Sequence, residues 1–178
     1  MPKEKRKLPP HVTISVSPFV PKPFTPFQWE PQDTREQILH KQKLLLAHTT
    51  NRKLRLSWHQ VDISQLEAVL ARGDRRVGQA VYLAWKKGCH LDAWEEQFRF
   101  DWWEEAMQEA GLSMAFYANR RRSFDEVLPW SHLDYGIRED FLRRENLKAR
   151  EAVTTPQCRE QCSGCGANSF LPGGVCFE

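Results

Sequence analysis

Residues 11–29 read HVTISVSPFVPKPFTPFQW, and this stretch is the strongest indication of fold in the sequence. At its start, apolar β-branched residues alternate with polar ones, which is typical of a strand with one face buried more deeply than the other: Val12, Ile14 and Val16. Five prolines follow between residues 18 and 31, interleaved with aromatic side chains. Because proline fixes the backbone and restricts the residue before it, this part is predicted to be a stiff, extended loop.

A helix and a second strand are predicted directly after this loop. Asp33 or Thr34 can cap a helix that runs to about residue 48. A second alternating segment lies between Leu54 and Trp58. Strand, helix and strand in this order predict a parallel pair with a crossover helix. The apolar side of that helix is expected to carry Ile38, Leu45 and Leu46.

Two strands are too few to close a barrel. A two-stranded parallel ribbon would expose two edges and most of its apolar faces. Residues 11–62 are therefore expected to belong to a larger sheet, whose other strands are supplied by another chain or have been lost from this one.

The rest of the chain divides into three further parts. Residues 1–10 are predicted to be a flexible basic arm, because they offer nothing to bury. Residues 63–137 are predicted to be a helical module whose apolar stripes form a core. Residues 138–178 are predicted to be a charged linker helix, acting as a spacer, followed by a cysteine-rich tail. The helices of the module are expected over residues 63–72, 75–87 and 101–110.

Composition limits the class of protein. An apolar fraction of 40% in 178 residues is enough for a core, while the net charge of +3 gives only weak support for a nucleic-acid partner and no indication of DNA binding. A mean hydropathy of −0.63 and the absence of a long apolar run predict no membrane association. The basic start lacks an apolar stretch that would make it a signal peptide, so a cytoplasmic location is expected.

The tail holds four of the five cysteines, three of them in a C-x3-C-x2-C arrangement. Such crowding of thiols in a reducing compartment indicates metal ligation more than disulfides, and the glycines at 164 and 166 allow a tight turn that aims several sulfurs at one site. Tetrahedral zinc and an iron-sulfur cluster both fit these thiolates. The predicted ligands are Cys158, Cys162, Cys165 and Cys176.

Residues 11–29 resemble the late-barrel signature of radical S-adenosylmethionine (SAM) proteins, in particular a bacterial family of uncharacterised members that often carry a cobalamin-binding-like N-terminal domain. ARGDRR at 71–76, LDAW at 91–94, LPWSHLD at 128–134 and the Cys-Gly tail resemble the C-terminal region of this family in the same order. The resemblance covers nearly the whole chain from about Lys7. It implies an α/β fold in which an incomplete, C-terminal part of a radical SAM barrel is followed by a mainly helical extension.

The resemblance also implies that the chain is not catalytic by itself. In radical SAM enzymes a C-x3-C-x2-C motif after the first barrel strand binds the cluster that holds SAM, and no such motif precedes His11. The expected function is therefore that of a C-terminal fragment or subunit, with a separately encoded N-terminal half as partner. SAM would bind only together with that half. The cysteine tail would add an auxiliary metal site.

Three polar residues are candidates for a position near substrate or cofactor. Lys22 and Gln28 lie on the loop after a barrel strand, where barrel active sites are built, and His59 follows the second strand. Ordinary solvation is the alternative for each of them. The sequence shows no convincing nucleophile and base, so the catalytic residues stay unknown.

A second hypothesis is a non-catalytic, zinc-binding module that contacts protein or RNA. Clustered arginines could meet phosphates and tryptophans could stack on bases, although solvated faces and core packing are expected to account for most of them. The arginines are Arg72, Arg75, Arg76, Arg120, Arg121 and Arg122, and the tryptophans are Trp94, Trp102, Trp103 and Trp130.

Overall fold

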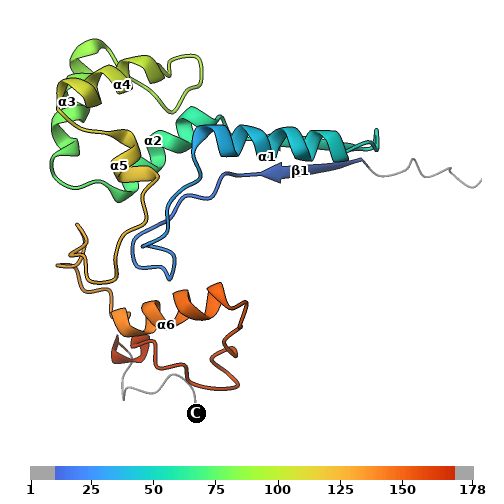
Figure 1. Cartoon of the computed structure of the whole chain (residues 1–178), viewed down its shortest axis with the longest axis vertical. Helices are drawn as coiled ribbons and strands as arrows, with labels where there is room; N and C mark the ends of the chain where they lie inside the picture. The colour runs from blue at the N-terminus through green and yellow to red at the C-terminus, as the bar shows by residue number, and fades with distance from the viewer. Residues whose placement is uncertain (1–10, 171–178) are drawn as a thin grey trace, which may run out of the picture.

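The computed structural model describes residues 11–170, so the predicted basic arm and Cys176 lie outside the described residues. Two strands, six α-helices and a short 3-10 helix make up this part, which is a mixed α/β arrangement (Figure 1). In chain order the elements are β1 (Val12–Val16), α1 (Arg35–His48), β2 (Leu54–Trp58), α2 (Val61–Arg72), α3 (Val77–Lys87), α4 (Phe100–Glu109), α5 (Met114–Ala118), α6 (Glu139–Arg150) and η1 (Ala167–Phe170).

The predicted strand–helix–strand unit is confirmed. β1 and β2 pair in parallel, with Val12 opposite Leu54 and Val16 opposite Trp58. Thr34, one of the two proposed caps, begins α1 with a capping box: its hydroxyl accepts a hydrogen bond from the backbone N–H of Gln37, and the Gln37 side chain accepts one from the backbone N–H of Thr34. Local sequence thus fixes both the strand period and the start of the helix.

The apolar side expected for α1 is only partly buried. Ile38 is buried, but Leu45 and Leu46 are exposed, which corrects the expectation for the second half of the helix. Figure 1 shows the reason, because α1 and β1 extend together away from the other helices. On β1, Val12 is 47% and Ile14 is 39% exposed. Within residues 11–170, the strand–helix–strand unit therefore presents apolar surface that no other element covers.

Helices α2 to α5 form the predicted helical body. Their shared core contains the stripe expected on α4, with Trp103, Ala106 and Met107 all buried. Gly88 ends α3 in the left-handed conformation, with a φ of 107°, which is typical of glycines that terminate helices. The five-residue helix α5 was not expected from the sequence. Among the described residues, no helix has both the length and the apolar character needed to cross a bilayer.

Helix α6 is more than the solvated spacer that its charges suggest. Leu142 and Asn146 are buried, and Leu142 belongs to a second apolar cluster with Trp29, Leu128 and Trp130. The Asn146 amide donates hydrogen bonds to the Pro26 carbonyl at 2.8 Å and to the Glu30 side chain at 2.9 Å. The proline-rich loop after β1 is therefore held between the helical body and α6.

Candidate functional site

Gln28 is an organising residue of the loop after β1. Its side chain is 3% exposed, and its Oε1 accepts hydrogen bonds from the Phe24 backbone N–H at 3.0 Å and from Trp130 Nε1 at 2.8 Å. Phe24 has a φ of 58°, an unusual value for an aromatic residue, and its ring stacks on Tyr135 at 4.2 Å between centroids. The amide that was predicted to lie near a ligand thus joins two distant segments.

A hollow of about 280 Å³ lies beside this amide. Gln28, Trp130 and Leu142 contribute to its wall, together with the exposed residues His132 and Asp134. Neither Lys22 nor His59 lines it. Gln28 therefore lines a polar and aromatic hollow, whereas the other two candidates, Lys22 and His59, lie outside it.

Lys22 and His59 face different parts of the helical body. Lys22, about half exposed, forms an ion pair with Glu67 on α2. His59 is exposed between β2 and α2. Asp62, three residues further, pairs with Arg35 of α1 at 2.8 Å. The ion pairs of Lys22 and Asp62 thus join the loop after β1 and α1 to α2, and Lys22, Gln28 and His59 do not line one common hollow.

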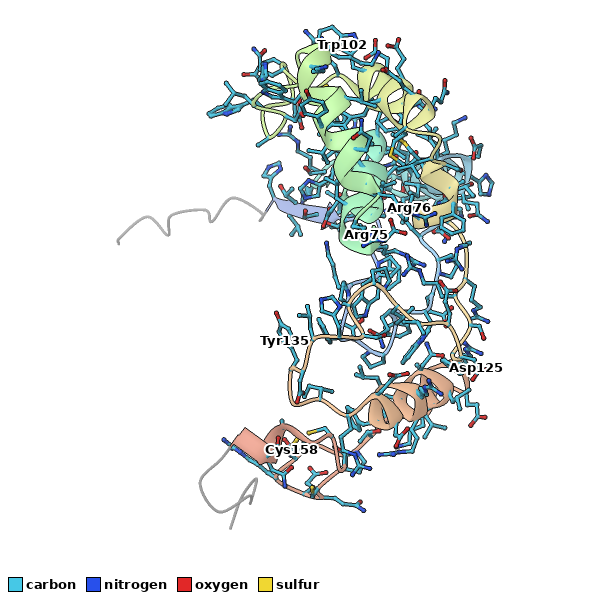
Figure 2. All side chains as sticks on the ribbon, turned by 90° about the vertical axis from the view of Figure 1, so that its left-hand side faces the viewer. Arg75, Arg76, Trp102, Asp125, Tyr135 and Cys158 are labelled. Atoms are coloured by element: carbon cyan, nitrogen blue, oxygen red, sulfur yellow. The ribbon has the colours of Figure 1, made fainter. Side chains whose placement is uncertain are left out.

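The arginines divide into exposed and buried groups, which corrects the expectation of a solvated face for two of them. Arg75, Arg76 and Arg121 are exposed, whereas Arg72 and Arg122 are buried. Figure 2 shows Arg75 and Arg76 at the start of α3, in the middle of the molecule.

The two buried arginines bind backbone carbonyls. The Arg72 guanidinium donates to the carbonyls of Glu30 and Arg120, and the Arg122 guanidinium donates to the Arg72 carbonyl. Arg120 makes two hydrogen bonds to Glu126, at 2.6 and 2.8 Å. These contacts join the loop after β1, the end of α2 and the segment after α5.

Burial and mutual repulsion lower the pKa of both buried guanidiniums. Desolvation, followed by the positive charges of Arg122 and Arg120, lowers the pKa of Arg72 to about 10. Desolvation and the charge of Arg120 lower the pKa of Arg122. Burial is the main cause of both shifts, and the neighbouring arginines add to it.

The tryptophans also divide into two groups. Trp103 is buried and donates its Nε1 hydrogen to Asp92 at 3.1 Å, and Trp130 is buried beneath the Arg122 guanidinium. Trp94 is 61% exposed. A further exposed residue, Trp85 on α3, stacks loosely on Tyr82 with 6.0 Å between centroids. Sequence reasoning missed Trp85, although its position three residues after Tyr82 puts both rings on one helix face.

The cysteine tail lies at the far end of the long axis from Trp102, as Figure 2 shows for Cys158. Cys158 and Cys162 are exposed and Cys165 is half-buried. The Ala167 backbone N–H donates to Cys165 Sγ at 3.5 Å, a contact that also occurs around metal-bound thiolates. Among residues 11–170, no three His, Cys, Asp or Glu side chains are placed to share an ion. The three described sulfurs do not converge on one point, and the predicted metal site stays a prediction.

The tail is held against the start of α6 by its backbone. The Arg138 N–H donates to the Cys165 carbonyl at 2.8 Å, and Arg144 donates to the Ser163 carbonyl at 3.3 Å. Gly166 has a φ of 97°, and a Cβ there would lie 2.6 Å from the Gly136 carbonyl oxygen. Only glycine fits this position, so the predicted glycine turn does shape the tail.

Comparison with known proteins identifies no relative of this chain. No family model matches the chain, and searches of curated proteins and of solved structures found no match. The family resemblance therefore stays a prediction that depends on the quoted residues, and the site has to be interpreted from its own chemistry.

Proposed function

We propose that this chain is the C-terminal part of a radical SAM iron-sulfur enzyme and supplies the last strand–helix–strand unit of its barrel. The observation that carries the proposal is the exposure of β1, whose Val12 and Ile14 are 47% and 39% exposed in a parallel sheet that has only two strands within residues 11–170. Parallel sheets normally have both faces covered, and two strands alone are marginal in water. Further strands from outside residues 11–170 would cover this surface.

The exposed part of α1 supports the same proposal. Leu44, Leu45 and Leu46 are exposed near its C-terminal end. In a closed barrel each crossover helix packs against its neighbours in the outer ring. A helix from the preceding unit would bury these leucines, which explains why they are apolar.

The loop after β1 would form part of the substrate side of the barrel. Barrel active sites are built from the loops at the carboxyl ends of the strands. This loop begins there and is fixed by Gln28, Trp29 and Asn146. Lys22, Gln28 and His59 keep the role of substrate-proximal or cofactor-proximal residues in this proposal, with Gln28 also holding the loop in place. The chemistry itself would come from the SAM-binding cluster of the N-terminal half.

Assembly with the N-terminal half tests this proposal. A separately encoded protein with the cluster-binding motif is co-expressed with this chain under anaerobic conditions, and SAM cleavage is measured with dithionite as reductant. The expected result is that the two proteins co-purify and that only the pair forms 5′-deoxyadenosine. A chain that remains a stable monomer in the presence of that protein, or that cleaves SAM alone, would refute the proposal.

Substitutions on the exposed strand sharpen the test. Ile14→Asp is expected to prevent co-purification, because it would bury a carboxylate against the added strands. Since Ile14 is already 39% exposed in the isolated chain, the thermal unfolding of that chain is expected to change little. Val153→Asp, at an exposed apolar residue just beyond α6, is the matched control and should leave assembly intact.

The tail would hold an auxiliary iron-sulfur cluster or a zinc ion on Cys158, Cys162, Cys165 and Cys176. The described sulfurs do not yet converge, and metal binding would draw them together, since such sites commonly fold around their metal. Metal analysis and a visible spectrum after anaerobic purification distinguish brown, iron-containing protein from colourless zinc protein. Cys162→Ser should abolish either metal, and unchanged metal content would refute this ligand assignment.

One observation favours a second candidate, a non-catalytic zinc module that binds RNA. Trp85 and Trp94 are both largely exposed, and Lys86 lies 4.9 Å from the centroid of the Tyr82 ring. Exposed aromatic rings beside a cation are typical of surfaces that stack unpaired bases. Binding of single-stranded RNA that is lost in Trp85→Ala, by a chain that fails to assemble with any N-terminal half, would favour this function.

A further inference from the structure

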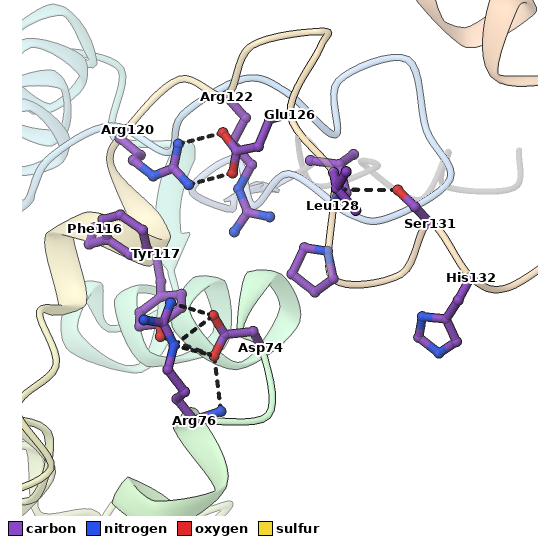
Figure 3. A pocket seen from close by; sticks show the side chains of 12 residues that line it. Asp74, Arg76, Phe116, Tyr117, Arg120, Arg122, Glu126, Leu128, Ser131 and His132 are labelled. Carbon is purple, nitrogen blue, oxygen red and sulfur yellow. Dashed lines mark hydrogen bonds and ion pairs between the residues drawn. The ribbon is translucent and has the colours of Figure 1, made fainter.

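A second hollow lies between the start of α3, helix α5 and the segment after it, and adjoins the hollow beside Gln28 at Leu128, Ser131 and His132. Its volume is about 440 Å³, within the usual range for small-molecule sites. Phe116 and Tyr117 lie among its charged residues, beside Arg120 and the Asp74–Arg76 pair, while Leu128 lies on the other side (Figure 3). The charged residues are Asp74, Arg76, Arg120, Arg122 and Glu126, and the others include Phe116, Tyr117, Leu128 and Pro129.

The charges around this hollow do not balance. Arg76 pairs with Asp74 and Arg120 pairs with Glu126, so each of these two carboxylates already has its own guanidinium. Two arginines are left over: Arg122 in the wall, and Arg72 behind it, whose guanidinium donates to the Arg120 carbonyl. The next carboxylate, Glu30, is itself engaged by Arg121 and Arg150. Two guanidiniums therefore lie beside the hollow without a carboxylate of their own.

The buried side chain of Arg122 is a second, independent indication that an anion binds in this hollow. It is 3% exposed, and its Nε and Nη1 have no hydrogen-bond partner among the described residues. In Figure 3 its guanidinium extends to the middle of the group, between the Arg120–Glu126 pair and Asp74. The guanidinium also lies over the Trp130 ring, 5.1 Å from its centroid. A buried cation with free donors is costly unless an anion or further acceptors complete it.

We propose that this hollow binds the phosphoryl group of a small phosphorylated molecule. A phosphomonoester carries close to two negative charges at neutral pH, which matches the two unneutralised guanidiniums better than a carboxylate does. The phosphoryl group would accept hydrogen bonds from the free Nε and Nη1 of Arg122, with Arg76 and Arg120 beside it and Arg72 behind the wall. Phe116, Leu128 and Pro129 would contact an apolar or aromatic part of the same molecule.

The proposed site is independent of barrel assembly. Neither β1 nor β2 contributes to its wall, so the isolated chain should bind a phosphomonoester whether or not an N-terminal half exists. Burial, followed by repulsion from neighbouring arginines, lowers the pKa of Arg72 and of Arg122, and a bound anion would offset both effects.

Phenyl phosphate is the appropriate probe, because it combines a dianionic phosphomonoester with an aromatic ring. Its binding to the purified full chain is measured by titration calorimetry at constant ionic strength, beside inorganic phosphate and benzoate. Phenyl phosphate is expected to bind at least about tenfold more tightly than benzoate, since the additional negative charge acts in a medium of low dielectric. Inorganic phosphate is expected to bind between the two.

Two surface variants keep the test independent of folding. Arg76→Gln removes an exposed cation at the mouth, and Val127→Asp places a carboxylate at the rim on a residue that is 85% exposed. Each is expected to weaken phenyl phosphate binding by about tenfold. Arg75→Gln, an exposed neighbour outside the hollow, is the control and should bind like the wild type.

Three results would overturn the proposal. The first is the absence of saturable binding of phenyl phosphate to the wild-type chain. The second is unchanged binding in both Arg76→Gln and Val127→Asp, which would place the phosphate elsewhere. The third is benzoate binding as tight as that of phenyl phosphate, which would contradict a site built for a dianion.

Discussion

Replacing Trp29 by alanine tests whether the loop after β1 is a fixed part of the core. Trp29 has no exposed surface, and its ring meets Phe124 edge to face with 4.9 Å between centroids. Truncation of a buried tryptophan costs about 3–5 kcal/mol, and the aromatic pair accounts for about 1 kcal/mol of that. Its indole N–H has no hydrogen-bond partner among the described residues, so no hydrogen bond is lost. We therefore expect Trp29→Ala to lower the free energy of unfolding by about 4 kcal/mol.

Urea denaturation followed by circular dichroism measures this change without depending on tryptophan fluorescence. Trp94→Ala is the control, because a ring that is 61% exposed should contribute within about 0.5 kcal/mol. A loss below about 1 kcal/mol for Trp29→Ala would show that the cavity closes easily and that the loop is not a fixed platform.

Three further predictions concern single residues. Gly78→Ala, where a Cβ would meet open space within α3, is expected to stabilise the chain by about 0.5 kcal/mol in urea denaturation, whereas Gly166→Ala should cost about 2 kcal/mol or more and increase proteolysis of the tail. Hydrogen bonds from Arg120 lower the pKa of Glu126 below 4.5, so this pair stabilises the fold above that pH and its contribution is lost as pH falls through the lower folded-state value. Melting temperatures measured from pH 7 to pH 3 should therefore fall less steeply for Glu126→Gln than for the wild type. Burial, followed by nearby carboxylates, raises the pKa of Cys89 to about 11, so this thiol should resist Ellman's reagent at pH 8 in the native chain while the exposed tail thiols of metal-free protein react.

Local patterns predicted the secondary structure well. The alternation at Val12, Ile14 and Val16, the cap at Thr34 and the stripe on α4 are each determined within a few residues. They depend on backbone sterics and on the side-chain period, which a single sequence contains. The same reasoning missed α5, because five residues are too few to show a helical period.

Long-range contacts could not be predicted in this way. The sequence suggested that Arg72 and Arg122 belong to a solvated face, since single arginines are usually exposed. Their guanidiniums bind carbonyls that lie 42 to 50 residues away, and a local sequence pattern cannot predict such contacts. Gln28 is a similar case, because its buried amide oxygen accepts a hydrogen bond from Trp130, 102 residues further along the chain. The hollow beside Arg122 was therefore beyond the reach of sequence reasoning.

The contact between Asn146 and the Pro26 carbonyl spans 120 residues and has a consequence for biosynthesis. A ribosome that adds about 5–20 residues per second needs on the order of 10 s to reach α6 after it has made the proline-rich loop. During that interval Trp29 and its neighbours have emerged but lack the helix that encloses them. This aromatic segment therefore stays uncovered until α6 is made, and slower translation lengthens the time for which it can aggregate.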